Sequence, residues 1–142
     1  MAVITDIADA VVAELNAGKF SQAFEAKRYY RPVFDLAEMS DLHVSVVPRG
    51  LTIERADRSR NQHDVQVDVA VQKKFETGDA AELDPLMALV EELADFFRLR
   101  RLATYPDAVW VRTENVPVYA QEHMEEFRQF TSVLTLTFRV VR

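Results

Sequence analysis

The residues best suited to chemistry in this chain are its three histidines, His43, His63 and His123. They lie far apart in the sequence, and none has a second histidine or a glutamate at the spacing of an HxH or HExxH metal motif. His43 falls on the polar side of an expected strand, and the other two lie in polar segments. We therefore expect solvent-exposed histidines, and the sequence predicts no metal site.

The carboxylates are also poorly arranged for acid–base catalysis, which needs two such groups held apart in a cleft with separated pKa values. Glu91 and Glu92 are adjacent residues on a predicted polar helix face. The acidic run 122–126 surrounds His123 and could in principle form a carboxylate–imidazole site. An acidic loop or a short helix would produce the same composition, and we favour that interpretation.

The glycines are too few and too widely spaced to form a phosphate-binding loop. Only Gly18, Gly50 and Gly78 are present, whereas the Walker and dinucleotide fingerprints need closely spaced glycines. No G-x-S-x-G elbow occurs, and no serine has a histidine and a carboxylate at a known local spacing. We expect no catalytic residue and no cofactor. The sequence therefore predicts that the chain is not an enzyme. A hydrolase or ligand-binding site assembled only in space stays open as an alternative.

One local cluster of charge falls on an expected loop, from Arg55 to His63. It contains Arg58 and Arg60 together with Asp57. Acidic residues interleave with the arginines, and no aromatic side chain is present on which a base could stack. Mixed charge of this kind suits a contact between proteins better than a contact with nucleic acid. Arg55, Asp57, Arg58, Arg60 and His63 are therefore the candidate interface residues.

Length and composition predict one domain over residues 1–142. The 49% hydrophobic and 28% charged residues are ordinary values for a globular protein, and there is no cysteine. The acidic N-terminus lacks the basic and apolar regions of a secretory signal, and charged residues interrupt every apolar run before it could span a bilayer. A net charge of −6 argues against general phosphate binding. We expect a soluble protein with no membrane partner.

Hydrophobic periodicity predicts an α+β fold with two helices and about six strands. The helices are expected over 6–17 and 84–101. The strands are expected over 23–31, 42–46, 51–54, 65–72, 108–113 (with a possible continuation past Pro117 to Tyr119) and 130–140.

Local signals predict where these elements begin and end. Thr5 or Asp6 should cap the first helix, and Gly18 should end it in the left-handed conformation. Asp84 should cap the second helix, with the proline that follows it at the first helical position. The Pro48-Arg49-Gly50 segment should reverse the chain between two strands.

The resulting order is α-β-β-β-β-α-β-β, an antiparallel or mixed sheet with both helices on its apolar face. Two helices cover one face of such a sheet well and the other poorly. Aromatic side chains in excess of the core and unpaired strand edges therefore imply burial against neighbouring molecules. We expect the chain to assemble with copies of itself.

The chain as a whole resembles the tail-terminator, or tail-completion, proteins of long-tailed bacteriophages. The resemblance rests on length, element order and several short segments rather than on one diagnostic motif. These segments are Ile4 to Leu15, Tyr30-Arg31-Pro32 with Phe34 and Leu36, Val46-Val47-Pro48-Arg49, Val69-Ala70-Val71-Gln72-Lys73-Lys74, Asp84-Pro85-Leu86-Met87, Glu114-Asn115, and Gln129 to Leu136.

This resemblance implies a structural virion protein at the head-proximal end of the tail, assembled in the host cytoplasm. It implies a homohexameric ring that ends polymerisation of the tail tube and offers a docking surface to a head-completion or neck protein. DNA would only pass through the ring, and an acidic ring would not adhere to phosphate. Another head–tail joining protein would need the same kinds of surface, so that alternative stays open.

Overall fold

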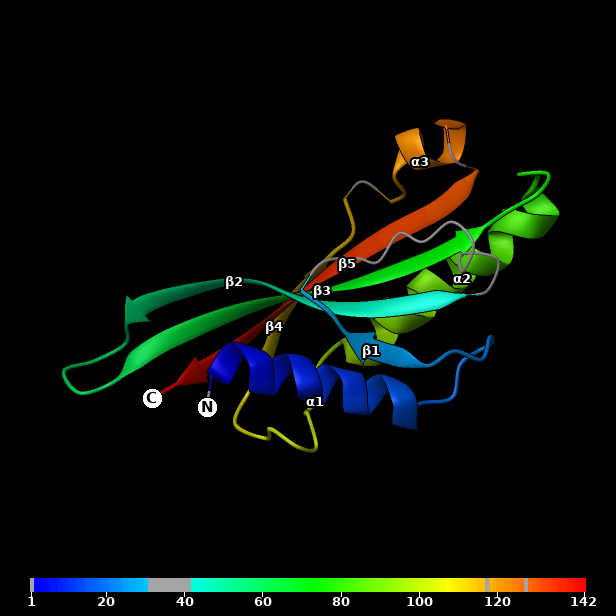
Figure 1. Ribbon diagram of the computed structural model, residues 1–142. Coiled ribbons are helices and arrows are strands. Elements are labelled where there is room, and N and C mark those ends of the chain that lie inside the picture. Colours follow the sequence, from blue (N-terminus) through cyan, green and yellow to red (C-terminus); the bar gives the residue numbers. More distant parts are fainter. Residues whose placement is uncertain (1, 31–41, 117, 127) are drawn as a thin grey trace.

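The computed structural model describes residues 2–30, 42–116, 118–126 and 128–142, and it shows an α+β fold (Figure 1). Three helices and five strands follow one another along the described chain. They are α1 (Val3–Ala17), β1 (Ala26–Arg28), β2 (His43–Arg55), β3 (Asn61–Lys74), α2 (Ala80–Phe97), β4 (Val109–Glu114), α3 (Gln121–Glu126) and β5 (Gln129–Val141).

The five strands form one mixed sheet in the order β1-β2-β3-β5-β4. The long strands β2, β3 and β5 are antiparallel neighbours, and β4 pairs antiparallel with β5. Short β1 is parallel to β2, with Ala26 opposite Val44, and it occupies only the middle of the strand expected over 23–31. Asn16 near the end of α1 fixes β1 in place, because its side-chain amide bonds both the N–H and the carbonyl of Ala26, at 2.8 and 3.1 Å.

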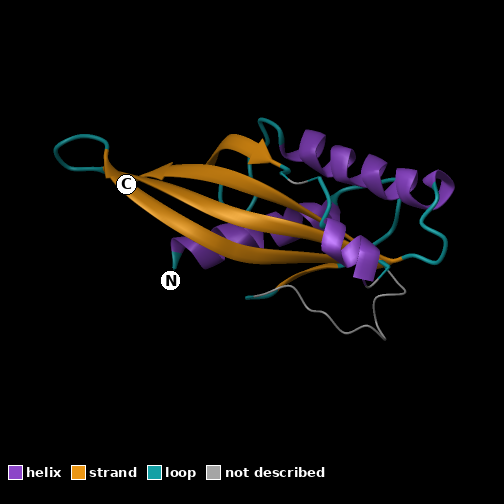
Figure 2. Cartoon of the chain, turned by 90° about the horizontal axis from the view of Figure 1, so that it is seen from above, coloured by secondary structure: helices purple, strands orange, loops and turns teal. Residues whose placement is uncertain are grey.

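Both long helices pack on the same face of the sheet, as the sequence predicts. The inward-facing valines of β3, Val65 to Val71 at every second position, belong to one buried cluster with the apolar stripes of α1 and α2. Ala70 of β3 points the other way and lies outside that cluster. Figure 2 shows the long strands from above, with α1 and α2 along them. Period-two alternation in the strands and apolar residues at helical spacing account for this core.

The expected chain reversal at Pro48-Arg49-Gly50 is wrong. β2 runs through this segment and stays paired with β3, with an irregularity between Pro48 and Gly50. A β-bulge absorbs the extra residue there, so the proline and glycine bend the strand instead of ending it. The predicted strands 42–46 and 51–54 are therefore one strand, and the sheet formed by the described residues has five strands instead of about six. The true reversal lies at 56–60.

The expected boundaries of the first helix need correction. α1 begins at Val3 after Ala2, and Thr5 donates its hydroxyl to the Ala2 carbonyl instead of capping the helix. Gly18 ends α1 with an extended backbone rather than in the left-handed region. A Cβ at Gly18 would meet the Phe20 ring at 2.8 Å, so close packing explains a glycine there.

The second helix begins earlier and ends earlier than expected, since α2 spans Ala80–Phe97. Asp79 is its cap and accepts a hydrogen bond from the Glu82 N–H at 3.1 Å. Pro85 lies inside the helix, where it removes one backbone hydrogen bond. The Asp84–Pro85 pair has the composition of a helix start, but the Asp79-x-x-Glu82 pattern of a capping box precedes it.

The second half of the chain largely follows the sequence pattern. β5 extends over the predicted strand 130–140, and β4 covers the predicted strand near 108–113 but ends at Glu114, so it does not continue to Tyr119. The acidic run 122–126 forms most of the short helix α3. No helix in the described part of the chain is long and apolar enough to cross a membrane.

Candidate assembly surface

The candidate interface segment lies at the tip of a long hairpin formed by β2 and β3. Arg55 is the last residue of β2, the turn spans 56–60, and His63 is in β3. Figure 1 shows this hairpin running past both chain termini and past the N-terminal end of α1. The end of the chain supports the hairpin as far as the turn, because Asn61, the first residue of β3, and Arg142 exchange two backbone hydrogen bonds, at 2.7 and 2.9 Å. The structure thus makes the segment a supported protrusion.

Asp57 organises the turn at the tip of the hairpin. Its Oδ1 accepts hydrogen bonds from the N–H groups of Ser59 and Arg60, at 2.9 and 2.8 Å. Its Oδ2 accepts from the Arg60 guanidinium at 2.8 Å. These bonds, led by that from Ser59, lower the pKa of Asp57 below its ordinary value. The carboxylate thus does what a glycine or proline often does in a tight turn.

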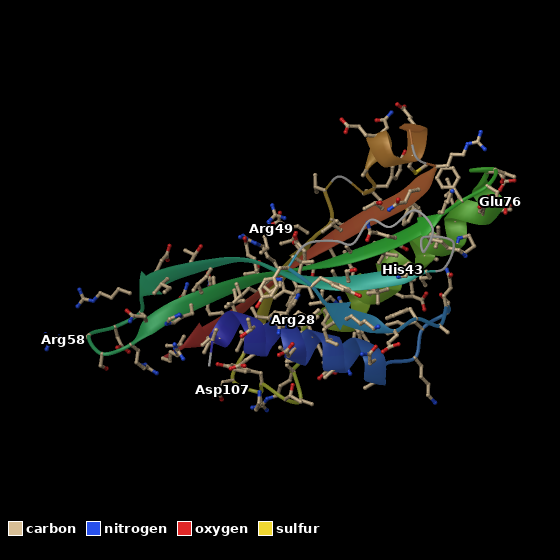
Figure 3. All side chains as sticks on the ribbon, viewed as in Figure 1. Arg28, His43, Arg49, Arg58, Glu76 and Asp107 are labelled. Carbon is tan, nitrogen blue, oxygen red and sulfur yellow. The ribbon has the colours of Figure 1, made fainter. Side chains whose placement is uncertain are left out.

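The tip is basic although the chain as a whole is acidic. Arg55, Arg58 and Arg60 with Asp57 give it a net charge of +2, whereas the whole chain carries −6. Asp57 is neutralised within the turn by Arg60. Arg58 has no ion-pair partner among the described residues, and it extends outward from the tip in Figure 3. The tip therefore offers positive charge to a partner.

The three histidines do not come together. His63 is buried, at 9% exposure, on the helix side of β3 between Ile53 and Val140, so its predicted exposure is wrong. His43 is half-buried at the start of β2. His123 belongs to α3, and its side chain lies outside the described residues. In the described part of the chain, no group of three or more His, Asp or Glu side chains could hold a metal ion.

Ion pairs and hydrogen bonds link β2, β3 and β5 on the face of the sheet that points away from the helices. Arg139 of β5 contacts the Asp64 carboxylate at 2.9 and 3.2 Å and lowers the pKa of Asp64. Asp68 accepts a hydrogen bond from the Thr135 hydroxyl at 2.8 Å, and Arg49 donates one to Thr135 at 3.0 Å. These cross-strand pairs stabilise the register of β2, β3 and β5 on the face that no long helix covers.

The opposite face of the hairpin carries apolar side chains that the helices leave uncovered. Leu51 and Ile53 lie opposite Val65 and His63, and they are 48% and 54% exposed. At the far edge of the sheet, and on the face away from the helices, Val109 of β4 is 62% exposed. The sequence pattern does not predict the exposed surface of Leu51 and Ile53, because it assigns 51–54 to a separate short strand. The alternation of Leu51 and Ile53 with polar neighbours is the signal that could have identified it.

Two shallow hollows lie elsewhere on the described surface. One of about 430 Å³ is lined by Leu15, Phe20 and Phe24 where α1 meets β1. The other, of about 250 Å³, lies beside β4 and is lined by Leu99, Arg101 and Trp110. Neither brings together a set of groups recognisable as a nucleophile, a base and an orienting carboxylate.

Comparison with solved structures shows a similarity of fold. The fold is similar to that of a solved protein described as the sheath/tube terminator of an extracellular contractile injection system, PVC, in its extended state, with a TM-score of 0.53 and 17% identity. The match covers 100% of this chain and 57% of that protein, so this chain corresponds to little more than half of its length. No protein-family model and no curated protein sequence matches. The similarity is one of fold.

Proposed function

We propose that this chain is a structural protein that terminates a phage tail or a related contractile tube. The observation that carries the proposal is the fold match, which spans the whole chain and concerns a sheath/tube terminator. The resemblance in length, element order and short segments to tail-completion proteins favours the same role. A supported hairpin with a basic tip and uncovered apolar strands provides the surfaces that such a role needs.

In this role the chain forms a homohexameric ring on the head-proximal end of the tail. One face of the ring stops addition of tube subunits, and the other receives a head-completion or neck protein. DNA passes through the ring without specific contacts, and the net charge of −6 on each copy disfavours adhesion to phosphate. The basic tip at Arg55, Arg58 and Arg60, with Asp57 and His63 behind it, contacts a neighbouring subunit or an acidic surface of the tube.

The first experiment images the purified protein by negative stain and measures its mass in solution over a range of concentrations. Closed six-fold rings are expected. The second adds the protein to its cognate tube protein during polymerisation, and shorter, capped tubes are expected. A strict monomer at every concentration together with unaltered tube lengths would refute the proposal.

A variant of the hairpin tip tests the contact surface. Replacing residues 56–60 by a two-residue Asn-Gly turn shortens the protrusion and keeps the strands joined. We expect an unchanged circular dichroism spectrum and a loss of either ring formation or tail joining. If both activities persist, the tip is not a contact site. The matched control, Lys19→Ala, removes an exposed charge at the far end of α1 and should change neither activity.

A further inference from the structure

Each edge of the sheet has a stretch that pairs with no further strand among the described residues. β1 pairs with β2 only at residues 44–46, and among the described residues no strand pairs with the outer side of β2 from Arg49 to Arg55. β4 forms the other edge and pairs only with β5 in the part of the chain that is described. Unpaired edges present rows of N–H and carbonyl groups that another strand can bind.

The two edges are suited to each other in direction. β2 and β5 are both antiparallel to β3, and β4 is antiparallel to β5, so β4 and β2 run in opposite directions. A second copy placed beside the first in the same orientation therefore brings its β2 antiparallel to β4. Such a contact is head-to-tail, and its repetition closes into a ring when the rotation between copies is right.

The edges also match in shape. β2 has its irregularity between Pro48 and Gly50, and β4 has one between Trp110 and Arg112. Gly50 and Arg112 belong to the same row of the sheet, because paired residues of β3 and β5 connect them. A bulge increases the local twist of its strand. Each edge thus bends at the same level.

Charge is complementary between the two edges. On the face away from the helices, β4 presents Arg112 and Glu114, an ion pair at 3.1 Å with both side chains more than half exposed. On the same face, β2 presents Arg49, whose side chain is 56% exposed, and Glu54. Within one chain, the pairing through β5 and β3 places Glu114 in the same row as Val47. If β2 of the next copy is shifted by two residues from this alignment, Glu114 meets Arg49. Arg112 then comes within diagonal reach of Glu54.

The same register brings apolar side chains together on the helix side. Ile53, which is 54% exposed, comes opposite Trp110, which is half-buried against the core. Leu51 comes opposite Thr113. We propose that the β2 edge of one copy, residues 49–55, pairs with the β4 edge, residues 109–114, of the next copy, which makes the sheet continuous between subunits. This inference rests on the proposed ring-forming function and names the strands that join the subunits.

Cross-linking tests the pairing directly, because the chain has no cysteine of its own. The variant Thr52→Cys/Val109→Cys places one exposed thiol on each edge. Within one chain, β3 and β5 separate these positions by three strand spacings, about 14 Å. A short bis-maleimide cannot bridge that gap, but it can join diagonal neighbours across the proposed contact. The control Lys19→Cys/Val109→Cys keeps one edge thiol and moves the other to the end of α1.

The edge variant should give a ladder of cross-linked species that ends at the copy number of the ring seen by negative stain, and the control should give none. Glu114→Arg should reduce the cross-linked fraction several-fold while the circular dichroism spectrum stays unchanged. Rings without cross-linking above the control would overturn the edge pairing and leave the proposed function standing. Cross-linked open filaments would support the pairing and refute ring closure. Monomers without cross-links would overturn the edge pairing, and monomers that also leave tube lengths unaltered would refute the proposed function as well.

Discussion

Replacing Glu14 tests whether one carboxylate holds the two long helices in register. Glu14 is in α1, and its side chain is only 8% exposed. It accepts a hydrogen bond from the Arg100 guanidinium at 2.9 Å and another from the Ala103 N–H at 2.7 Å, both beyond the end of α2. The Arg100 guanidinium also lies 3.7 Å from the centre of the Phe96 ring. One acidic side chain therefore joins segments that are distant in the sequence.

The magnitude follows from the exposure of the partners. Glu14→Ala removes the acceptor of the part-buried hydrogen bond from the Ala103 N–H, and hydrogen bonds to charged groups contribute about 1.5–3 kcal/mol each. Arg100 is 38% exposed, so water replaces much of what its guanidinium loses. The free energy of unfolding should therefore fall by about 2–3 kcal/mol, below the roughly 3–5 kcal/mol typical of a broken, fully buried ion pair. Glu14→Gln, which keeps one acceptor, should cost about half as much.

Urea unfolding followed by circular dichroism measures these changes, and Arg100→Ala with the double variant completes a thermodynamic cycle. The matched control is Asp9→Ala, which removes another carboxylate from the same helix. Asp9 pairs with Arg28 at 2.7 Å, and its side chain is 59% exposed. That control should cost under about 1 kcal/mol. A loss below about 0.5 kcal/mol for Glu14→Ala would refute the reasoning, because an ordinary surface substitution produces as much.

Three further predictions concern the turns that connect the strands and helices. The Glu82 carboxylate accepts hydrogen bonds from Thr77 and from neighbouring N–H groups, which lower its pKa from 4.5 to about 2. The contribution of the ionised Glu82 to stability should therefore be complete above pH 4.5 and lost as the pH falls towards 2. The melting temperature of Glu82→Gln should lie below that of the parent at pH 7, and the two melting temperatures should converge near pH 2. Gly78→Ala should cost about 1–3 kcal/mol in urea unfolding, because Gly78 has φ +70° and a Cβ there would lie 2.9 Å from an aromatic ring. Gly50→Ala, whose Cβ would meet only the flexible end of a glutamine side chain at 3.2 Å, is the matched control and should cost less. Asp57→Ala should speed amide exchange at the hairpin tip and change the global stability by no more than about 0.5 kcal/mol, and unchanged exchange would contradict the role given to this carboxylate.

The regular parts of this fold could be predicted because their apolar residues repeat at the period of the element. The alternating valines of β3 and the alternating core residues of β5 identify both strands and the face that each buries. The parallel pairing of β1 could not be predicted, because it depends on the side chain of Asn16 reaching the backbone of Ala26. No local pattern in the sequence indicates that these two residues meet.

The errors at the hairpin arise from competition between local and long-range preferences. Pro48 and Gly50 favour a turn locally, but pairing with β3 continues on both sides of them, so the bulge is the more stable solution. The real turn contains neither residue type and depends on Asp57. The charge pattern therefore predicts the candidate interface residues at the tip. The exposed apolar residues beside them, Leu51 and Ile53, can be recognised as a surface only when β2 is known to be one long strand. Residues 31–36, which contribute to the family resemblance, lie outside the described residues.

The proposed edge pairing, if it has the strength that the exposed side chains of the hairpin allow, favours closed rings over open dimers. Leu51 and Ile53 are each about half exposed, so covering both would contribute roughly 1–3 kcal/mol at each contact between copies. That is small beside the several kcal/mol that association costs in lost translational and rotational freedom. A single pair of copies is therefore weak. A closed ring gains one extra contact without a further loss of translational freedom, so edge pairing of this strength favours rings over dimers, and mass measurements should show monomers and rings with few intermediates.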